Sequence, residues 1–225
     1  FQVEKKVILS FYSALQTAPL DKVEEVCSQF ISKNYLWQSY HPFSDQYCSK
    51  DLAKQFWIPL KKSIKSLQRR QDIFIAGQNE IDNFQSTWVV SMGHLMGLFD
   101  ESWLGIQPTN KMVLLRYAEF NKVEKNKIIQ TAMYFDIPHF MTQANLNPFP
   151  NATGMNLVQP GPMTHDGLYF TKQKQKTGKK TLSAINYMIN SLGNWDNKLS
   201  LEKELQLSWH DDMIWWGPTG IGSTF

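Results

Sequence analysis

The chain has 225 residues, of which 42% are hydrophobic and 13% aromatic, and its formal net charge is +3. This length fits one or two domains, and the apolar content excludes a disordered chain, which would need low hydrophobicity and high net charge. The segment Thr171–Lys180 holds five lysines and no acid, so the rest of the chain carries 3 − 5 = −2. We expect this segment to be a solvated loop. A nucleic-acid-binding protein usually has a larger basic face, so no nucleic-acid partner is expected.

The sequence also argues against metal, cofactor and membrane sites. Cys27 and Cys48 lack CxxC spacing and the five histidines form no HExxH pattern, so we expect reduced thiols and no metal or cofactor. The longest stretch without Asp, Glu, Lys or Arg, Ile137–His165, contains five prolines and cannot be a membrane-spanning helix. The first residues do not resemble a signal peptide. A cytoplasmic protein without membrane contact is therefore predicted.

Helical periodicity is the main signal in the first third of the chain. Apolar residues recur every three or four positions over Val3–Leu15, which predicts an amphipathic helix. A second helix is predicted from Asp21, because Asp21 and Glu24 have the spacing of a capping box. The short aromatic segment Asn34–Tyr40 is typical of a strand.

A third helix is predicted over Lys50–Leu67, where Pro59 should kink or divide it. The period then changes to two, and four strands are predicted: Arg69–Ala76, Asn83–Leu98, Met112–Asn121 and Lys127–Phe135. Helices followed by a run of strands indicate an α+β fold with a curled antiparallel sheet.

The segment after Pro148 differs in composition from the part before it. Residues 148–180 are rich in Pro, Gly and Asn and are predicted to be a linker, with a short β-segment at Gly167–Thr171. Helices at Thr181–Leu192 and Ser200–Leu207 and an aromatic strand at Asp211–Pro218 then repeat the opening order of elements. We predict a first domain over 1–147 and the incomplete opening of a second similar domain over 181–225. A chance similarity of element order is the alternative.

Three local strings occur in a recognisable order: Ser91–Phe99 (SMGHLMGLF), Gly105–Lys111 (GIQPTNK) and Lys127–Asp136 (KIIQTAMYFD), with Gln143 following. Together they resemble the SnoaL-like polyketide cyclases, or ester cyclases, of the nuclear-transport-factor-2-like (NTF2-like) superfamily. The residues that match are His94, Gly97, Phe99, Gly105, Pro108, Thr109, Lys111, Phe135, Asp136 and Gln143. Asn110 replaces the usual glycine, and Met92 and Gly93 replace the usual residues before the histidine.

The resemblance implies a cone-shaped fold, in which a strongly bent sheet wraps a long helix and leaves a deep apolar pocket. It covers about residues 1–147. The string HDDMIWWGPTGIG at 210–222 looks like the opening of the same family. Superfamily members include enzymes and noncatalytic binding modules, so the fold alone does not decide function.

Asp136 and His94 are the candidate catalytic residues. A carboxylate in an apolar pocket has a raised pKa and could remove a proton next to a carbonyl, and the resemblance implies this role for Asp136 in an aldol ring closure. Alternatively, Asp136 caps the turn before Ile137. His94 shares a strand face with Trp88 and could hydrogen-bond an enolate if that face looks into the cone. Alternatively, His94 is a satisfied core residue.

Seven further residues are candidates for substrate contact. Alternation along the strand places Arg116 and Tyr117 on opposite faces, so at most one of them can line a pocket. The full candidate set is Phe56, Trp88, Trp103, Arg116, Tyr117, Tyr134 and Gln143.

Three functions fit these residues. The first is a cofactor-independent cyclase or isomerase acting on a hydrophobic carbonyl compound, which requires Asp136 and His94 to meet in one enclosed pocket. The second is a noncatalytic small-molecule-binding or dimerisation module, in which these side chains are apart or Met and Phe side chains fill the pocket. The third is a lactone or epoxide hydrolase that uses Asp136 with Arg116. The partners expected are a hydrophobic small molecule and a second copy of the chain.

Overall fold

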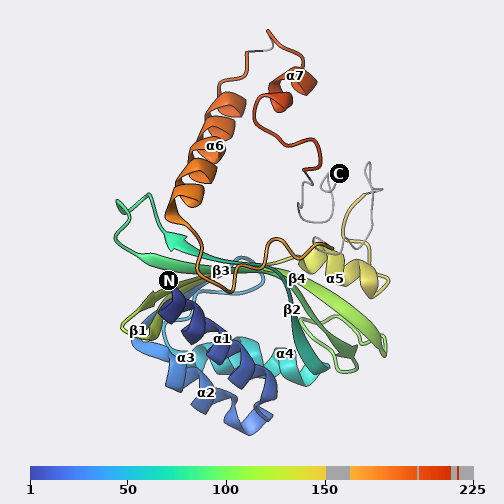
Figure 1. Cartoon of the computed structure of the whole chain (residues 1–225). Helices are drawn as coiled ribbons and strands as arrows, with labels where there is room; N and C mark the ends of the chain where they lie inside the picture. The colour runs from blue at the N-terminus through green and yellow to red at the C-terminus, as the bar shows by residue number, and fades with distance from the viewer. Residues whose placement is uncertain (151–162, 197, 214–216, 218–225) are drawn as a thin grey trace.

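The central feature of the computed structural model, which describes residues 1–150, 163–196, 198–213 and 217, is a curved five-stranded sheet (Figure 1). Its strands are β1 (Ile31–Gln38), β2 (Ile64–Gln78), β3 (Thr87–Phe99), β4 (Lys111–Glu124) and β5 (Lys127–Phe135). They lie in the order β1-β5-β4-β3-β2. The helices within residues 2–63 precede the main run of strands, which confirms the predicted α+β class.

One strand pairing differs from the predicted antiparallel sheet. Strands β2 to β5 form an antiparallel meander, but β1 pairs parallel with β5. Strand β1 comes before the helical segment at residues 49–63 and joins the free edge of β5 from outside the meander. No hairpin therefore fixes its direction.

The helices α1 (Gln2–Thr17), α2 (Val23–Phe30), α3 (Ser49–Leu52) and α4 (Ile58–Ser63) all lie on one face of the sheet, which we call the inner face (Figure 1). Helix α1 buries Ile8, Phe11, Tyr12 and Leu15. These positions form the apolar stripe that its sequence predicts.

The start of the second helix was predicted wrongly. A 3₁₀ turn, η1 (Leu20–Lys22), contains Asp21, and α2 begins after it with Lys22 at an N-cap that has no side-chain hydrogen bond. The predicted capping box is therefore absent. Ile31 extends the helical apolar pattern, but it pairs with Ile128 of β5 and begins β1.

The predicted helix over Lys50–Leu67 is divided, as expected at Pro59. It consists of α3, a π-helical segment η2 (Ala53–Trp57) and α4, which carries Pro59 in its first turn. The Ile58 N–H bonds the Ala53 carbonyl in this π-helical segment, and Pro59, the second residue of α4, has no N–H of its own to donate. The helix ends at Ser63 rather than Leu67, because Ile64 already pairs with Phe99 of β3.

The remaining helices are α5 (Ile137–Gln143), α6 (Gln175–Gly193) and α7 (Leu201–Gln206). They lie on the other side of the sheet, which we call the outer face (Figure 1). Helix α6 begins earlier than predicted, so the second half of the lysine segment is exposed helix and not loop. Both C-terminal helices were predicted.

Two predictions concern the segments around these helices. The β-segment expected at Gly167–Thr171 is a single parallel bridge between Leu168 and Phe74 at the free edge of β2. Half of the aromatic strand expected at Asp211–Pro218, residues 214–216 and 218, lies outside the described residues, and residues 211–213 are not in a strand. Within the part of the chain that the structure describes, no helix is long and apolar enough to cross a membrane.

Candidate functional site

The two faces of the sheet carry different polar side chains. Along β4 every second residue from Val113 to Val123 is buried, and these positions face the helices. The alternate residues of β4, which include Arg116, point to the outer face. Arg116 and Tyr117 therefore lie on opposite faces, as predicted.

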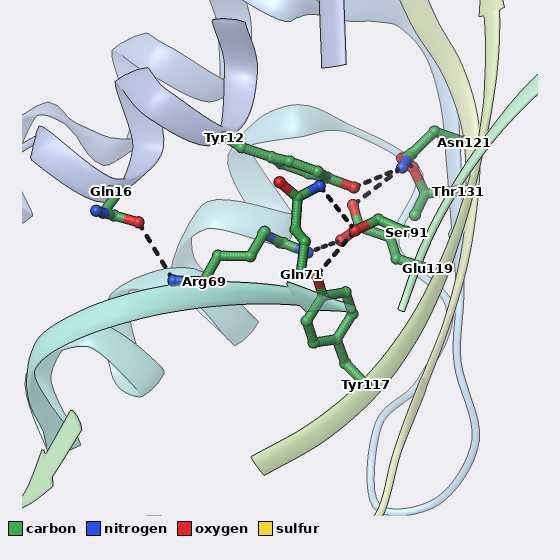
Figure 2. Close-up of polar contacts among 9 residues, drawn as sticks. All are labelled: Tyr12, Gln16, Arg69, Gln71, Ser91, Tyr117, Glu119, Asn121 and Thr131. Carbon is green, nitrogen blue, oxygen red and sulfur yellow. Dashed lines mark hydrogen bonds and ion pairs between the residues drawn. The ribbon is translucent and has the colours of Figure 1, made fainter. Parts of the chain in front are cut away.

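A buried ion pair lies on the inner face, between helix α1 and the sheet (Figure 2). The Nη1 atom of Arg69 lies 2.6 Å from Oε2 of Glu119, and the two side chains are 7% and 2% exposed. The Arg69 guanidinium lies over the Tyr12 ring at 3.7 Å and the Tyr117 ring at 4.5 Å from their centroids. Burial opposes the charge on Arg69, but Glu119 holds its pKa above the ordinary value.

Hydrogen bonds extend this inner network across three strands (Figure 2). Asn121 donates to Glu119 at 3.2 Å and accepts from the Thr131 hydroxyl at 2.7 Å. The Ser91 and Tyr117 hydroxyls lie 2.8 Å apart. Burial raises the pKa of Tyr117, so it stays protonated. The groups that could act as acid or base on this face are thus engaged with one another.

Sequence reasoning missed Tyr12, Arg69, Glu119 and Asn121 as members of a buried polar network. A signal was present, because Glu119 and Asn121 occupy the buried phase of a strand that is otherwise apolar at those positions. Buried carboxylates are rare unless they are paired. That pattern predicts an internal counter-charge.

The outer face holds a second buried cluster, which includes three predicted site residues. His94 and Arg116 are directly opposite each other on β3 and β4. The Nδ1 atom of His94 lies 3.3 Å from Oδ2 of Asp72, and the backbone N–H of Asp136 donates to the Arg116 carbonyl at 3.1 Å. The Arg116 guanidinium donates to the carbonyl of Gly217. His94, Arg116 and Asp136 are therefore close together, but on the face away from helix α1.

Asp136 makes the capping contact that was the alternative to a catalytic role. It is the N-cap residue of α5, and its Oδ1 accepts from the His139 backbone N–H at 3.0 Å. Burial lowers the pKa of the His139 imidazole, and the nearby Asp136 carboxylate partly opposes this effect. His139 is therefore a neutral imidazole beside Asp136. Sequence reasoning did not single out His139.

Gln143 has a contact that explains its position. Its side-chain amide donates to the Leu114 carbonyl at 2.8 Å and accepts from the Leu114 N–H at 2.9 Å. This pair of bonds attaches the end of α5 to the side of β4. Gln143 thus fixes the position of α5, the helix that Asp136 caps and that contains His139.

Aromatic side chains fill the interior where the resemblance implied a deep pocket. Phe56 is fully buried and Trp103 is 4% exposed. The Phe56 ring contacts the Phe43 and Phe135 rings at 5.2 and 4.9 Å, and Trp103 contacts Phe140 at 5.4 Å. We call this set the aromatic cluster; it consists of Trp37, Phe43, Phe56, Phe99, Trp103, Phe135 and Phe140.

A small cavity remains beside the aromatic cluster, at the end of β5. Its volume is about 60 Å³, and it is lined by Ser39, Tyr40, His41, Phe43, Tyr134, Phe135 and Ile137. Pockets that bind drug-sized molecules have about 300–1,000 Å³. Tyr134 lines this cavity, whereas Trp88 lies in the outer phase of β3 and bonds Ser86 at 2.8 Å. Among the described residues, no three His, Cys, Asp or Glu side chains are grouped to hold a metal ion.

No protein-family model and no curated protein sequence matches the chain. Solved structures do match. A candidate SnoaL-like polyketide cyclase from Jannaschia sp. CCS1 is 16% identical, with a TM-score of 0.51, and the match covers 65% of this chain and 94% of that one. AclR, a candidate hydroxylase from Streptomyces galilaeus, is 13% identical, with a TM-score of 0.52 and coverages of 66% and 89%.

IdmH, a candidate polyketide cyclase from Streptomyces antibioticus, is 11% identical, with a TM-score of 0.50, and the match covers 64% of this chain and 99% of that one. Identities this low establish the fold and leave the activity open. Each match includes nearly the whole neighbour and about two thirds of this chain. The chain therefore contains one complete module with the NTF2-like fold of the SnoaL-like polyketide cyclases, and this confirms at the level of fold the resemblance seen in its motifs.

Proposed function

We propose that this chain is a noncatalytic interaction module of the NTF2-like fold, and that it pairs with a second copy through the outer face of its sheet. The filled interior is the observation that carries this proposal. The aromatic cluster and the Arg69–Glu119 ion pair occupy the inner side of the sheet, and the cavity beside them has about 60 Å³. A polyketide-like substrate needs several times that volume.

The outer face supports pairing because adjacent strands expose apolar side chains there. Ile75, Leu98, Met112 and Tyr134 lie in the outer phase of β2, β3, β4 and β5 and are 38%, 36%, 59% and 40% exposed. Leu98 and Met112 are directly opposite each other in the sheet. Ile75 and Tyr134 pair with Val90 and Ala118, further along the same sheet, so only Leu98 and Met112 are neighbours. Exposed apolar side chains that adjoin, as these two do, mark interaction surfaces. A two-fold dimer would place the same surface on both subunits.

Light scattering after size-exclusion chromatography tests this pairing. We expect the wild-type chain to elute as a dimer and the Leu98→Lys variant to dissociate with a Kd at least about tenfold higher. Ile81→Lys is the matched control, because Ile81 is 93% exposed in the turn between β2 and β3. A wild-type monomer at every concentration, or equal effects of the two variants, would contradict the proposal.

A second candidate is the acid/base cyclase or isomerase, and the outer cluster is the observation that favours it. Asp136, His94 and Arg116 are gathered with His139, whose pKa is lowered by burial. A neutral imidazole can accept a proton next to a carbonyl, and Arg116 could stabilise the enolate. Substrate would have to reach this cluster from the outer face.

Proton exchange separates the two candidates without knowledge of the substrate. The hydrophobic ketone 2-tetralone exchanges its α-protons in D₂O, and ¹H NMR follows the rate. For a noncatalytic module we expect the same rate with protein as in buffer. Acceleration that disappears in both Asp136→Asn and His94→Gln would instead support acid/base catalysis and overturn the noncatalytic proposal.

A further inference from the structure

The loop between β1 and α3, residues 39–48, is closed at its base and exposed at its tip. Trp37 and Gln46 exchange two backbone hydrogen bonds, of 2.8 and 2.9 Å. The Ser39 hydroxyl donates to the Met133 carbonyl at 2.7 Å, which ties the first arm of the loop to β5. Beyond these anchors Tyr40 is 68% exposed. The pairing of β1 therefore does not depend on the residues of the tip.

One side chain of this loop, Phe43, enters the aromatic cluster. Its ring lies 5.2 Å from Phe56, 5.6 Å from Phe135, 5.9 Å from Trp37 and 6.0 Å from Trp103, measured between centroids. The residues on either side of it, at 42 and 44, are exposed. Phe43 thus fills a place that four aromatic side chains of the body of the module surround.

The cavity of about 60 Å³ lies directly beside this ring, since Phe43 and Phe135 belong to its lining. The Tyr40 and Tyr134 rings, which also line it, lie 5.1 Å apart between centroids with their planes tilted by 34°. The lining contains no Asp, Glu, Lys or Arg, and its polar groups are the hydroxyls of Ser39, Tyr40 and Tyr134 and the imidazole of His41. If the Phe43 ring swung out, its place and the cavity would become one continuous aromatic site.

We propose that Phe43 is an intramolecular plug, and that a neutral molecule of one or two aromatic rings with a hydroxyl group displaces it. The rings of such a ligand would take the place of the Phe43 ring, because aromatic pairs favour centroid separations of about 4.5–7 Å. Its hydroxyl would meet the polar groups of the lining. The site shares Tyr134 with the outer-face surface, but the place that the rings would take lies in the aromatic cluster inside the module.

The plug and the ligand compete for the same space. In the wild-type chain the closed loop lowers the apparent affinity by the fraction of molecules in which the site is open. Truncation of the Phe43 ring removes this competition and leaves an apolar cavity. Cavities of this kind bind small aromatic molecules.

Calorimetric titration with 2-naphthol tests the plug. We expect Phe43→Ala to bind it at least about tenfold more tightly than wild type, since the competing ring is gone. Phe74→Ala is the matched control, because Phe74 is fully buried and contacts Phe170 away from this loop. It should bind no more tightly than wild type. Tyr47→Ala, at an exposed position of the same loop, should also leave binding unchanged.

Equal affinity of Phe43→Ala and wild type would overturn the inference, as would equally tight binding by Phe74→Ala, since any core cavity would then suffice. If Phe43→Ala does not fold, Phe43→Leu replaces it, with an intermediate gain expected. Amide chemical shifts of the wild-type chain give an independent reading: saturating 2-naphthol should move those of residues 39–47. Shifts confined to other segments would contradict the plug. Light scattering measures dimerisation in a separate experiment, so the result for the dimer does not decide the result for the Phe43 plug.

Discussion

The inner network and the outer cluster contain the same kinds of charged group but differ in what those groups bind. On the inner face Arg69 and Glu119 pair directly, enclosed by Tyr12 and Tyr117. On the outer face Arg116 binds a backbone carbonyl from the C-terminal part of the chain, and Asp136 caps α5. The inner charges therefore join α1 to the sheet, whereas the outer charges attach the later elements. Burial alone does not make a charged residue catalytic.

Breaking the inner ion pair should have the largest effect. Glu119→Gln leaves the Arg69 guanidinium buried without its counter-charge, and removal of one partner of a buried pair costs about 3–5 kcal/mol. We expect that loss in the free energy of unfolding measured by urea titration. The double variant Arg69→Met/Glu119→Leu is the control and should recover most of it, since apolar replacement of a whole pair is often neutral. A loss below about 1 kcal/mol in Glu119→Gln would show that the pair is not enclosed.

Asp136 tests the capping role on the outer face. Asp136→Ala should lower the free energy of unfolding by about 1 kcal/mol, because the His139 N–H loses its acceptor. Asp136→Ser should keep most of the stability, since serine is also a good N-cap. If the serine variant is as unstable as the alanine variant, the carboxylate has a further role in the outer cluster.

Tyr117 tests the edge of the inner network. Tyr117→Phe removes the hydroxyl 2.8 Å from Ser91 and should cost about 0.5–1 kcal/mol. The loss is at the lower end because Gln71 also contacts the Ser91 hydroxyl, at 3.2 Å. A double-mutant cycle with Ser91→Ala measures the coupling. A coupling energy near zero would show that the two hydroxyls act independently.

His139 should make a modest contribution to the pH dependence of stability. Its pKa is lower in the folded chain because of burial, so the unfolded chain binds the proton first as the pH falls through about 6.5. Stability from this residue is therefore present above that pH and is lost in acid. Urea titrations between neutral and mildly acidic pH should show a shallower decline in His139→Gln. Parallel curves for the two proteins would contradict this assignment.

The periodicity of apolar residues predicted most helices and strands. It failed where the same residues fit both a helical and a strand period. The strand Lys127–Phe135 was predicted with its bounds, because alternation and the turn before it agree. The helix predicted to Leu67 was too long, since Ile64 and Leu67 fit a helical face as well as a strand. Only pairing of Ile64 with Phe99 places it in β2. For the site, His94, Asp136 and Arg116 lie together on the outer face, whereas the sequence interpretation required them to meet in an enclosed pocket inside the cone.

The sequence by itself determined the α+β class, the two phases of each strand and the placement of Arg116 and Tyr117 on opposite faces, because these follow from local periodicity. Only the tertiary structure decided which phase the helices cover, since both phases of β3 and β4 contain apolar and polar residues. The tertiary structure also decided that Glu119 pairs with Arg69, fifty positions away in the sequence, and that Phe43 packs in the aromatic cluster. Such contacts join distant segments, and no periodic pattern records them.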